Sequence, residues 1–465
     1  KKPLPRFWYL PNNNKAAMIL AGDDHNVANA GGTERIINNW LNESPVGCST
    51  LDWQCVKASH YTYQGSALTN ARAAQYHRLG YEIGDHISNS SACNDFTSYS
   101  NLGTIFTNDL TLWRAKYSSI PNQRTHRFHC YLWSDWDSMP RVGLDNGIRY
   151  SLDYVAYPGS WVNGRAPMVT GSGMNMRLTD ADGDMLDYYQ GVTNLDDTAA
   201  NSTAINALLD NALSSAGYYG IFGTHYDMGN SYHQTVYDAA KARNIPMISS
   251  EEALTWLDGR GSSTFSNFSG SNGQFTFTLA AAEGSQGLKA MMPLDDAGGT
   301  LSTLKKGSDT VSYQTQTVKG VQYAVFDGAP GQYTATYSDY TTDPGTSPDP
   351  GVPDSGNGGS SGGAASGSTG ATSQAKKNKT VFDSQEDETP VVATNNPAPG
   401  PETTPVPDSE EQAEQREKEL IQNDGNKQSS GFPWWLVSFA GILLVGGLWW
   451  FIATRRKRHD QQLWQ

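Results

Sequence analysis

The chain has 465 residues, with 33 Lys and Arg against 47 Asp and Glu, and a formal net charge of -14. That length suits more than one domain, and the acidic balance argues against a nucleic-acid-binding protein, because phosphates require a basic surface. Aromatic residues make up 11% of the chain; they can stack on sugar rings, but they also serve in ordinary cores.

Residues 1–260 alternate short apolar runs with helical stretches. The runs "AAMILAG", "YEIGDHI", "RFHCYLW" and "GIFGTHYD" predict strands, whereas "TNARAAQYHRLG" and "STAINALLDNALSSAG" predict helices. Strands that alternate with helices indicate βαβ units around a parallel sheet. The predicted fold class is therefore α/β, and a last helix is expected at 250–258 with Ser250 as its N-cap.

The chain changes character after this region. Residues 264–339 contain short strands separated by Gly and Asp turns, which predict a small all-β sandwich. Residues 340–430 are rich in Pro, Gly, Ser and acidic residues, and they hold too little apolar surface to offset the entropy of ordering. We expect this segment to be a disordered linker or stalk.

A membrane anchor is expected near the C-terminus. Residues 434–453, within a predicted helix at 431–454, carry no charge over 20 residues, and Trp pairs stand near both ends. A buried core helix is the alternative, but the preceding stalk offers nothing to pack against. The basic residues of 455–465 predict a cytoplasmic tail, so the rest of the chain is expected outside the cell, on a single-pass membrane protein.

Export normally requires a signal peptide, and "KKPLPRFWYLP" contains no apolar stretch of that kind. We therefore expect the sequence to be processed or truncated at its start. An extracellular location also favours disulfides. Cys48 and Cys55 close a short loop and are expected to pair, which leaves Cys93 and Cys130 for a second bridge; a cysteine metal site lacks the usual spacing.

Acidic and imidazole side chains recur where predicted strands end. This group comprises Asp23, Asp24, His25, Asp85, His86, His129, Asp135, His225 and Asp227. Each histidine alone is more simply explained as structural. Together, at the ends of strands that converge on one face of a barrel, they predict a metal site. Zinc or a similar divalent cation suits these ligands and could activate water for hydrolysis.

The motifs that hold these residues resemble those of the polysaccharide deacetylase superfamily, the NodB-homology carbohydrate esterases. The family pattern T-F-D-D-G corresponds here to "LAGDDH", the pattern H-E-[IV]-G-x-H-[ST]-x-x-H to "GYEIGDHISNS", and a late strand with a catalytic His to "GTHYD". The resemblance spans about residues 15–258. It implies a distorted (β/α) barrel, a divalent metal, and removal of N- or O-acetyl groups from a polysaccharide.

The resemblance also implies roles for four residues. Asp23 would be the general base, Asp24 a metal ligand, His86 a second ligand, and His225 the acid that protonates the leaving group. The chain departs from the pattern at Ser90, where the family has a ligand histidine.

Ser90 is a poor metal ligand, so the third ligand must come from elsewhere in the chain or be water. His129, on a neighbouring predicted strand, is the preferred replacement, and His25 is the second choice. If His129 is the ligand, His25 faces the substrate.

Substrate contacts are expected from the Gly-rich stretch 159–190 and from the late strand. Trp161 would stack on a sugar and Arg177 would donate hydrogen bonds, although a surface loop without function explains this stretch equally well. Tyr226, between His225 and Asp227, is also assigned to substrate binding.

The sequence thus predicts a cell-surface, metal-dependent polysaccharide deacetylase. The alternative is a surface glycan-binding protein or adhesin that kept the barrel and lost turnover. A glycosidase is less favoured, because its carboxylates would flank a sugar and would not be adjacent in the chain.

Overall fold

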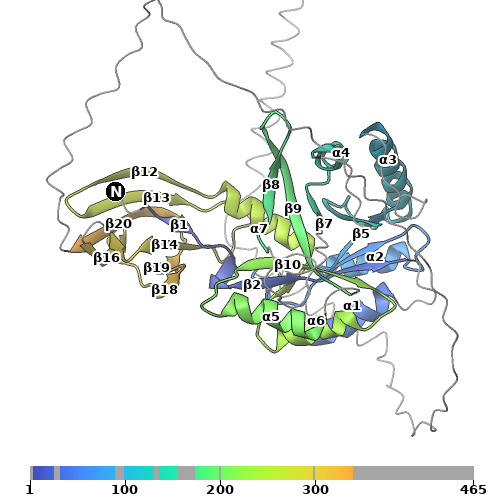
Figure 1. The fold of residues 1–465 in the computed structure, drawn as a ribbon, viewed down its shortest axis with the longest axis horizontal. Helices are drawn as coiled ribbons and strands as arrows, with labels where there is room; N and C mark the ends of the chain where they lie inside the picture. Colours follow the sequence, from blue (N-terminus) through green and yellow to red (C-terminus); the bar gives the residue numbers. More distant parts are fainter. Residues whose placement is uncertain are drawn as a thin grey trace, which may run out of the picture. The chain divides into compact units, whose positions relative to one another are not determined.

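The computed structural model describes residues 4–25, 32–88, 99–129, 136–154, 173–197, 201–296 and 299–338 (Figure 1). The predicted bridge between Cys93 and Cys130, the predicted stacking residue Trp161, the stalk, the membrane anchor and the basic tail lie outside these residues. Among the described residues, the structure contains no helix with the length and apolar character needed to cross a membrane.

Seven parallel strands close into a barrel. The ring runs β3-β4-β5-β6-β7-β9-β10 and returns to β3, with every neighbouring pair parallel. Its strands are β3 (Ala21–Asp24), β4 (Ser59–Thr62), β5 (Glu82–Ile87), β6 (Thr125–Phe128), β7 (Tyr150–Tyr154), β9 (Met185–Asp196) and β10 (Gly220–Asp227). The predicted α/β class with a (β/α) barrel is confirmed at this level.

Three further strands extend the ring. β2 (Ala16–Ile19) precedes β3 and pairs with the first half of β10, and β11 (Met247–Ile248) pairs with β2. β8 (Met176–Thr179) forms an antiparallel hairpin with β9, visible as a long paired ribbon in Figure 1.

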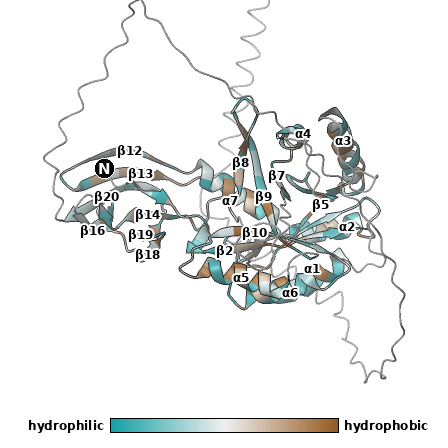
Figure 2. Ribbon diagram, viewed as in Figure 1, coloured by the Kyte–Doolittle hydropathy of each residue, from teal (hydrophilic) through white to brown (hydrophobic). Residues whose placement is uncertain are grey.

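Helices follow most of the strands, as the alternating pattern predicts. They are α1 (Thr33–Glu43), α2 (Asn70–Arg78), α3 (Tyr99–Lys116), α4 (Ser138–Asp145), α5 (Ser202–Leu213), α6 (Tyr232–Lys241) and α7 (Ser250–Ser262). Figure 2 shows hydrophobic and hydrophilic residues alternating along α5 and α6. The apolar stripe of each helix packs on the strands, and the polar one faces solvent.

The N-cap of α7 is Ser249, not Ser250. The Ser249 hydroxyl accepts from the backbone N–H of Glu252, and the Glu252 carboxylate accepts from the Ser249 N–H, which is a capping box. Ser249 and Ser250 are adjacent, so the sequence alone did not show which of them is the N-cap. The reciprocal hydrogen bonds with Glu252 identify Ser249.

Alternation along β2 and β3 divides the apolar side chains between two cores. Ala17, Ile19 and Ala21 belong to the core that includes Tyr61, Tyr150 and Trp256. The intervening residues Ala16, Met18 and Leu20 belong to the core under α1, α5 and α6. Because side chains alternate along a strand, this phase decides which way the residues at the end of β3 point.

The all-β part consists of two antiparallel sheets. One sheet has the order β1-β14-β19-β18, and the other has the order β12-β13-β20-β16-β15, with β17 beside β16. Its strands are β1 (Arg6–Phe7), β12 (Thr264–Ser271), β13 (Gln274–Ala280), β14 (Lys289–Pro293), β15 (Asp295–Asp296), β16 (Gly299–Lys306), β17 (Asp309–Thr310), β18 (Gln314–Val318), β19 (Val321–Asp327) and β20 (Gly331–Ser338). Both sheets contribute to one hydrophobic cluster, which is sandwich packing.

The start of the chain joins this sandwich. β1 pairs with β14, and Phe7 stacks on Phe265 with ring centroids 4.1 Å apart. Arg260, at the end of α7, donates to the carbonyl oxygen of Trp8. The predicted disulfide between Cys48 and Cys55 is present, with its Cα atoms 5.3 Å apart.

Candidate metal and catalytic site

The two adjacent carboxylates at the end of β3 point to opposite sides. Asp23 follows the phase of Ala17, Ile19 and Ala21 and lies inside the barrel. Asp24 lies on the other side, where its Oδ2 accepts from the hydroxyls of Thr33 (3.0 Å) and Ser66 (3.4 Å). The residues that surround Asp23 come from β5, β6, β9 and β10.

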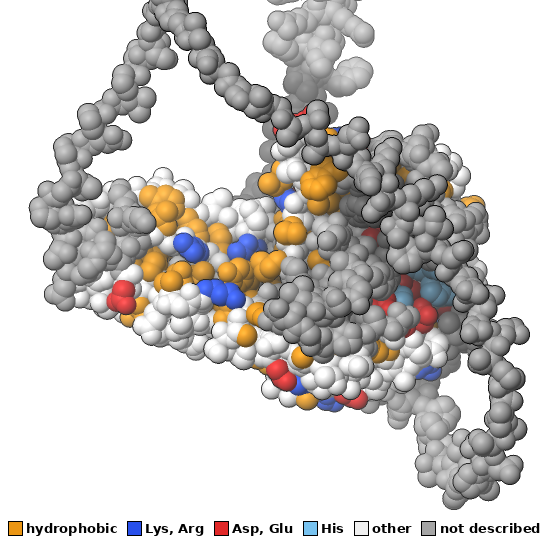
Figure 3. Space-filling view, viewed as in Figure 1, with side chains coloured by type: hydrophobic (Ala, Val, Ile, Leu, Met, Phe, Trp, Pro, Cys, Tyr) orange, Lys and Arg blue, Asp and Glu red, His pale blue; other side chains and the backbone are white. Residues whose placement is uncertain are grey.

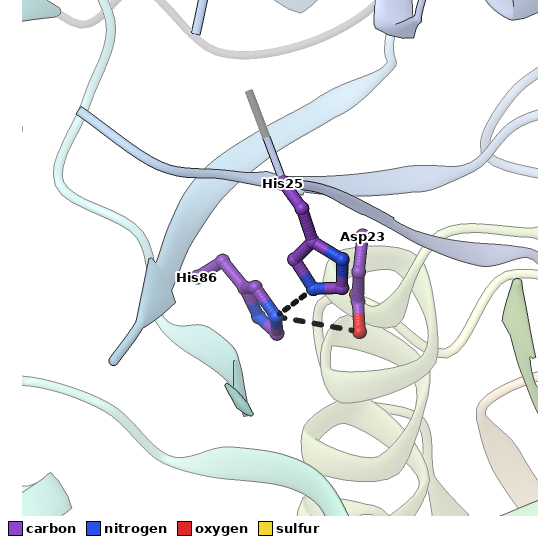
Figure 4. A group of neighbouring side chains, drawn as sticks. All are labelled: Asp23, His25 and His86. Carbon is purple, nitrogen blue, oxygen red and sulfur yellow. Dashed lines mark hydrogen bonds and ion pairs between the residues drawn. The ribbon is translucent and has the colours of Figure 1, made fainter. Parts of the chain in front are cut away.

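Two imidazoles meet beside Asp23 (Figure 4). The Nε2 atoms of His25 and His86 are 3.0 Å apart, and His86 Nε2 is 3.6 Å from Asp23 Oδ2. His86 Nδ1 lies 3.1 Å from the carbonyl oxygen of Arg127, and His25 Nδ1 lies 3.3 Å from Asp227 Oδ1. Burial, aided by the neighbouring His25 and His129, lowers the pKa of His86 to about 3, although Asp23 opposes this. His86 is therefore neutral at pH 7.

His129 and Tyr63 complete the wall around these imidazoles. The ring centroid of His129 lies 5.1 Å from that of His25 and 5.5 Å from that of His86. The Tyr63 ring stacks on His86 at 5.1 Å. Burial raises the pKa of Tyr63 to about 12, so its hydroxyl keeps its proton. The structure thus brings His25, His86 and His129 together. The sequence assigned His86 and His129 to the metal, with Asp24, and His25 to the substrate.

His225 connects Asp23 to a second carboxylate pair. Its Nε2 lies 3.1 Å from Asp23 Oδ2, and its Nδ1 lies 3.1 Å from Asp196 Oδ2 and 3.0 Å from Asp197 Oδ1. Burial lowers the pKa of His225, but the three carboxylates outweigh burial and raise it well above its ordinary value. His225 is therefore an imidazolium at neutral pH.

Arg127 supports Asp23 from within the barrel. It is fully buried, and its guanidinium donates to the carbonyl oxygen of Thr224 at 2.6 Å and lies 3.9 Å from Asp23 Oδ2. Burial raises the pKa of Asp23, but His86, Arg127 and His225 together lower it well below its usual range. Asp23 is a carboxylate at any pH at which the protein would work.

These residues fit a divalent cation. One ligand atom each from Asp23, His25 and His86 all lie within 4.8 Å of one another. Asp196, Asp197 and His225 are as close together, but the imidazolium of His225 presents no lone pair, so the cation fits the first group. Among the described residues, the buried Oδ1 of Asp23 has no hydrogen-bond partner. Imidazole nitrogens with a carboxylate beside them suit zinc and similar ions, and the unpaired Asp23 oxygen can then contact a water held by the ion. Figure 3 shows acidic and histidine side chains gathered at one place on the visible face.

Two residues assigned to substrate binding lie elsewhere. Tyr226 is fully buried on the opposite side of β10 from His225, and its hydroxyl is 3.2 Å from His60 Nε2. Arg177 lies on the β8–β9 hairpin, where it pairs with Asp187 and covers the ring of Tyr189. Alternation along β10 places Tyr226 away from the site whenever His225 faces it.

Sequence reasoning missed four residues of the site: Arg127, Asp196, Asp197 and Tyr63. Two signals were present in the sequence. Asp196 and Asp197 form a second adjacent carboxylate pair at a strand end, in "TNLDD", and Arg127 is a charged residue inside a buried strand. Tyr63 carried no such signal.

Comparisons with known proteins found no matching family model and no matching curated protein. Similar solved structures include a mutant of the CE4-family pseudoenzyme BA3943 with restored enzymatic activity (12% identity, 52% of this chain and 68% of that one, TM-score 0.31). They also include the Bc1960 peptidoglycan N-acetylglucosamine deacetylase (10%, 51% and 87%, 0.30) and the carbohydrate deacetylase Agd3 (9%, 69% and 65%, 0.33).

Proposed function

We propose that this protein is a metal-dependent hydrolase that removes acetyl groups from a polysaccharide. The observation that carries the proposal is the placement of His225 between Asp23 and the pair Asp196 and Asp197, directly beside the imidazoles of His25 and His86. A carboxylate, an imidazolium and a candidate cation site in contact supply a base, an acid and an electrophile for one reaction.

Asp23 is suited to act as the base. One of its oxygens contacts His225, and the other, Oδ1, has no hydrogen-bond partner among the described residues. That oxygen can take the proton of a water that adds to the acetyl carbonyl carbon. The bound divalent cation, with His86 and His129 among its expected ligands, would polarise that carbonyl and lower the pKa of the water.

His225 is suited to act as the acid. Asp196 and Asp197 hold its Nδ1, so its Nε2–H is directed to the side of Asp23 where the reaction would occur. When the bond from the acetyl carbon to the sugar nitrogen or oxygen breaks, the Nε2 proton goes to that leaving atom. Acetate and the free amine or hydroxyl are the products.

The location of the enzyme is part of the proposal and rests on the sequence alone. The uncharged segment 434–453 and the basic residues that follow it support a single-pass anchor with the barrel outside the cell. A polysaccharide of the cell envelope or its surroundings would then be within reach.

The proposal is tested by acetate release. The full chain, in detergent and loaded with Zn²⁺, is incubated with a panel of N- and O-acetylated polysaccharides, and acetate is measured before and after chelation. We expect release on at least one polysaccharide, and its loss on chelation. Binding of an acetylated polysaccharide without any acetate release would contradict the enzyme and support the glycan-binding alternative.

A further inference from the structure

We propose that His25 is a ligand of the cation, paired with His86 and oriented by Asp227, in place of the neighbouring Asp24. The inference deepens the proposed function, since it rests on the same cation. The family pattern has a glycine at this position, so the ligand would be particular to this chain.

Proton positions on the two imidazoles support this assignment. His86 Nδ1 faces the carbonyl oxygen of Arg127, which can only accept, so Nδ1 carries the proton and Nε2 presents a lone pair. His25 Nδ1 lies 3.3 Å from a carboxylate oxygen of Asp227, and this electrostatic contact favours the proton on Nδ1 here too. Two lone pairs then face each other across 3.0 Å, which is unfavourable unless a positive charge lies between them.

The distance between the imidazoles suits a shared metal ion. Zinc–nitrogen bonds of about 2.0–2.1 Å put two ligand nitrogens about 2.8–3.4 Å apart for angles between roughly 90° and 110°. The observed separation of the Nε2 atoms, 3.0 Å, falls in the lower half of this interval. A regular tetrahedral angle would place the two nitrogens about 3.3–3.4 Å apart, so a small separation of the rings brings the pair to that geometry.

Asp227 supplies the support that metal-binding histidines usually have. A histidine ligand commonly gives its other ring proton to a carboxylate or carbonyl, which fixes the ring orientation. The Arg127 carbonyl does this for His86, and Asp227 lies within ion-pair distance of His25 Nδ1, where it can take the same role. Asp24 is committed on the other side of β3, to Thr33 and Ser66.

The test measures Zn²⁺ affinity by competition with a chromophoric chelator, with the full-length protein and four variants. His25→Ala should weaken binding by more than the ~10- to 100-fold change typical of groups that only orient a ligand. Asp227→Asn should weaken it within that ~10- to 100-fold range. Asp24→Asn, the adjacent carboxylate, and His77→Ala, an exposed histidine on α2, should leave the affinity unchanged. Circular dichroism checks that each variant folds, and His25→Gln replaces His25→Ala if the latter does not.

The outcomes separate this inference from the proposed function. Unchanged Zn²⁺ affinity in His25→Ala would overturn the inference, and the 3.0 Å contact would then be explained by a proton shared between the two imidazoles. Loss of Zn²⁺ affinity in Asp24→Asn would overturn it as well. If affinity depends on His25 but no polysaccharide loses acetate, the metal assignment stands and the proposed activity fails. If acetate is released and His25→Ala still binds Zn²⁺ normally, the activity stands and the assignment fails.

Discussion

The two ends of β5 hold buried ionisable side chains whose surroundings differ in hydrogen bonding. At its start, the Glu82 carboxylate accepts from the hydroxyls of Ser59 and Thr125 and from the backbone N–H of Glu251 at the beginning of α7. At its end, His86 lies beside Asp23, whose Oδ1 has no hydrogen-bond partner among the described residues. Both ends are buried, but only the first is fully hydrogen-bonded.

The Glu82 end of β5 is therefore suited to stabilising the fold, whereas the His86 end is suited to binding or reaction. A buried carboxylate that is satisfied by several donors links the elements that supply them, here β4, β6 and α7. A buried carboxylate that keeps a free oxygen is costly for folding, and it persists where a ligand or a reaction uses it. The family pattern includes both Glu82 and His86. In the structure Glu82 is hydrogen-bonded to neighbouring elements, whereas His86 lies in the candidate site.

The largest expected effect is on turnover at the His86 end. Asp23→Asn keeps the shape of the side chain but removes the base, so kcat/KM for acetate release should fall by ~100- to 10,000-fold. Zn²⁺ content and thermal stability should stay near those of the unchanged protein. If the variant keeps full turnover, Asp23 is not the base, and the unpaired Asp23 oxygen beside His86 has another role.

An intermediate effect is expected on stability at the Glu82 end. Glu82→Ala leaves the two hydroxyls and the Glu251 N–H without their acceptor, and the free energy of unfolding should fall by about 2–4 kcal/mol. Denaturant unfolding measures this change. The folded fraction should retain its Zn²⁺ affinity, and a selective loss of Zn²⁺ with unchanged stability would contradict the division between the two ends.

The smallest effect is expected at His60 of β4, away from the candidate site, on the dependence of stability on pH. Burial, helped by the neighbouring His233, lowers the pKa of His60 to about 3, against the attraction of Asp23. The unfolded chain binds a proton near pH 6.5 that the folded chain does not, so His60 contributes stability above pH 6.5 that is lost as the pH falls toward 3.

His60→Gln cannot titrate but can still bond the Tyr226 hydroxyl. Between pH 6 and 4 its free energy of unfolding should therefore fall less steeply than that of the unchanged protein, by about 1.4 kcal/mol per pH unit. Urea unfolding at several pH values provides the comparison. Equal slopes would show that His60 titrates alike in both states.

Much of the barrel could be predicted from the chain, because each strand–helix pair has its own local signal. Closure of the ring could not: β9 pairs with β10 in parallel and with β8 as a hairpin, and neither partner is marked by local residues. The short β1 carries no strand signal of its own, since its two residues depend on β14 for pairing.

The site was predictable in position but not in orientation. The strand-end carboxylates and histidines indicated where the site lies. Which of Asp23 and Asp24 faces inward depends on the phase of β2 and β3, and both faces of these strands are apolar and buried. A parallel strand buried on both sides has no polar face to reveal its phase. The phase of β10 was equally hidden in the sequence, which is why Tyr226 was assigned to substrate binding together with its neighbour His225.

The pairing of β1 with β14 has a consequence for how the chain acquires its fold. Arg6 is opposite Met291 and Phe7 is opposite Ala290, so β1 and its partner strand are separated by more than 280 residues of chain. Contacts this distant in the chain close slowly, because a long loop must be ordered first. The barrel strands, whose partners are mostly nearer, can associate earlier. Closure of the sandwich around β1 would therefore be a late step in folding, and it would bring the backbone of Trp8 to Arg260 at the same time.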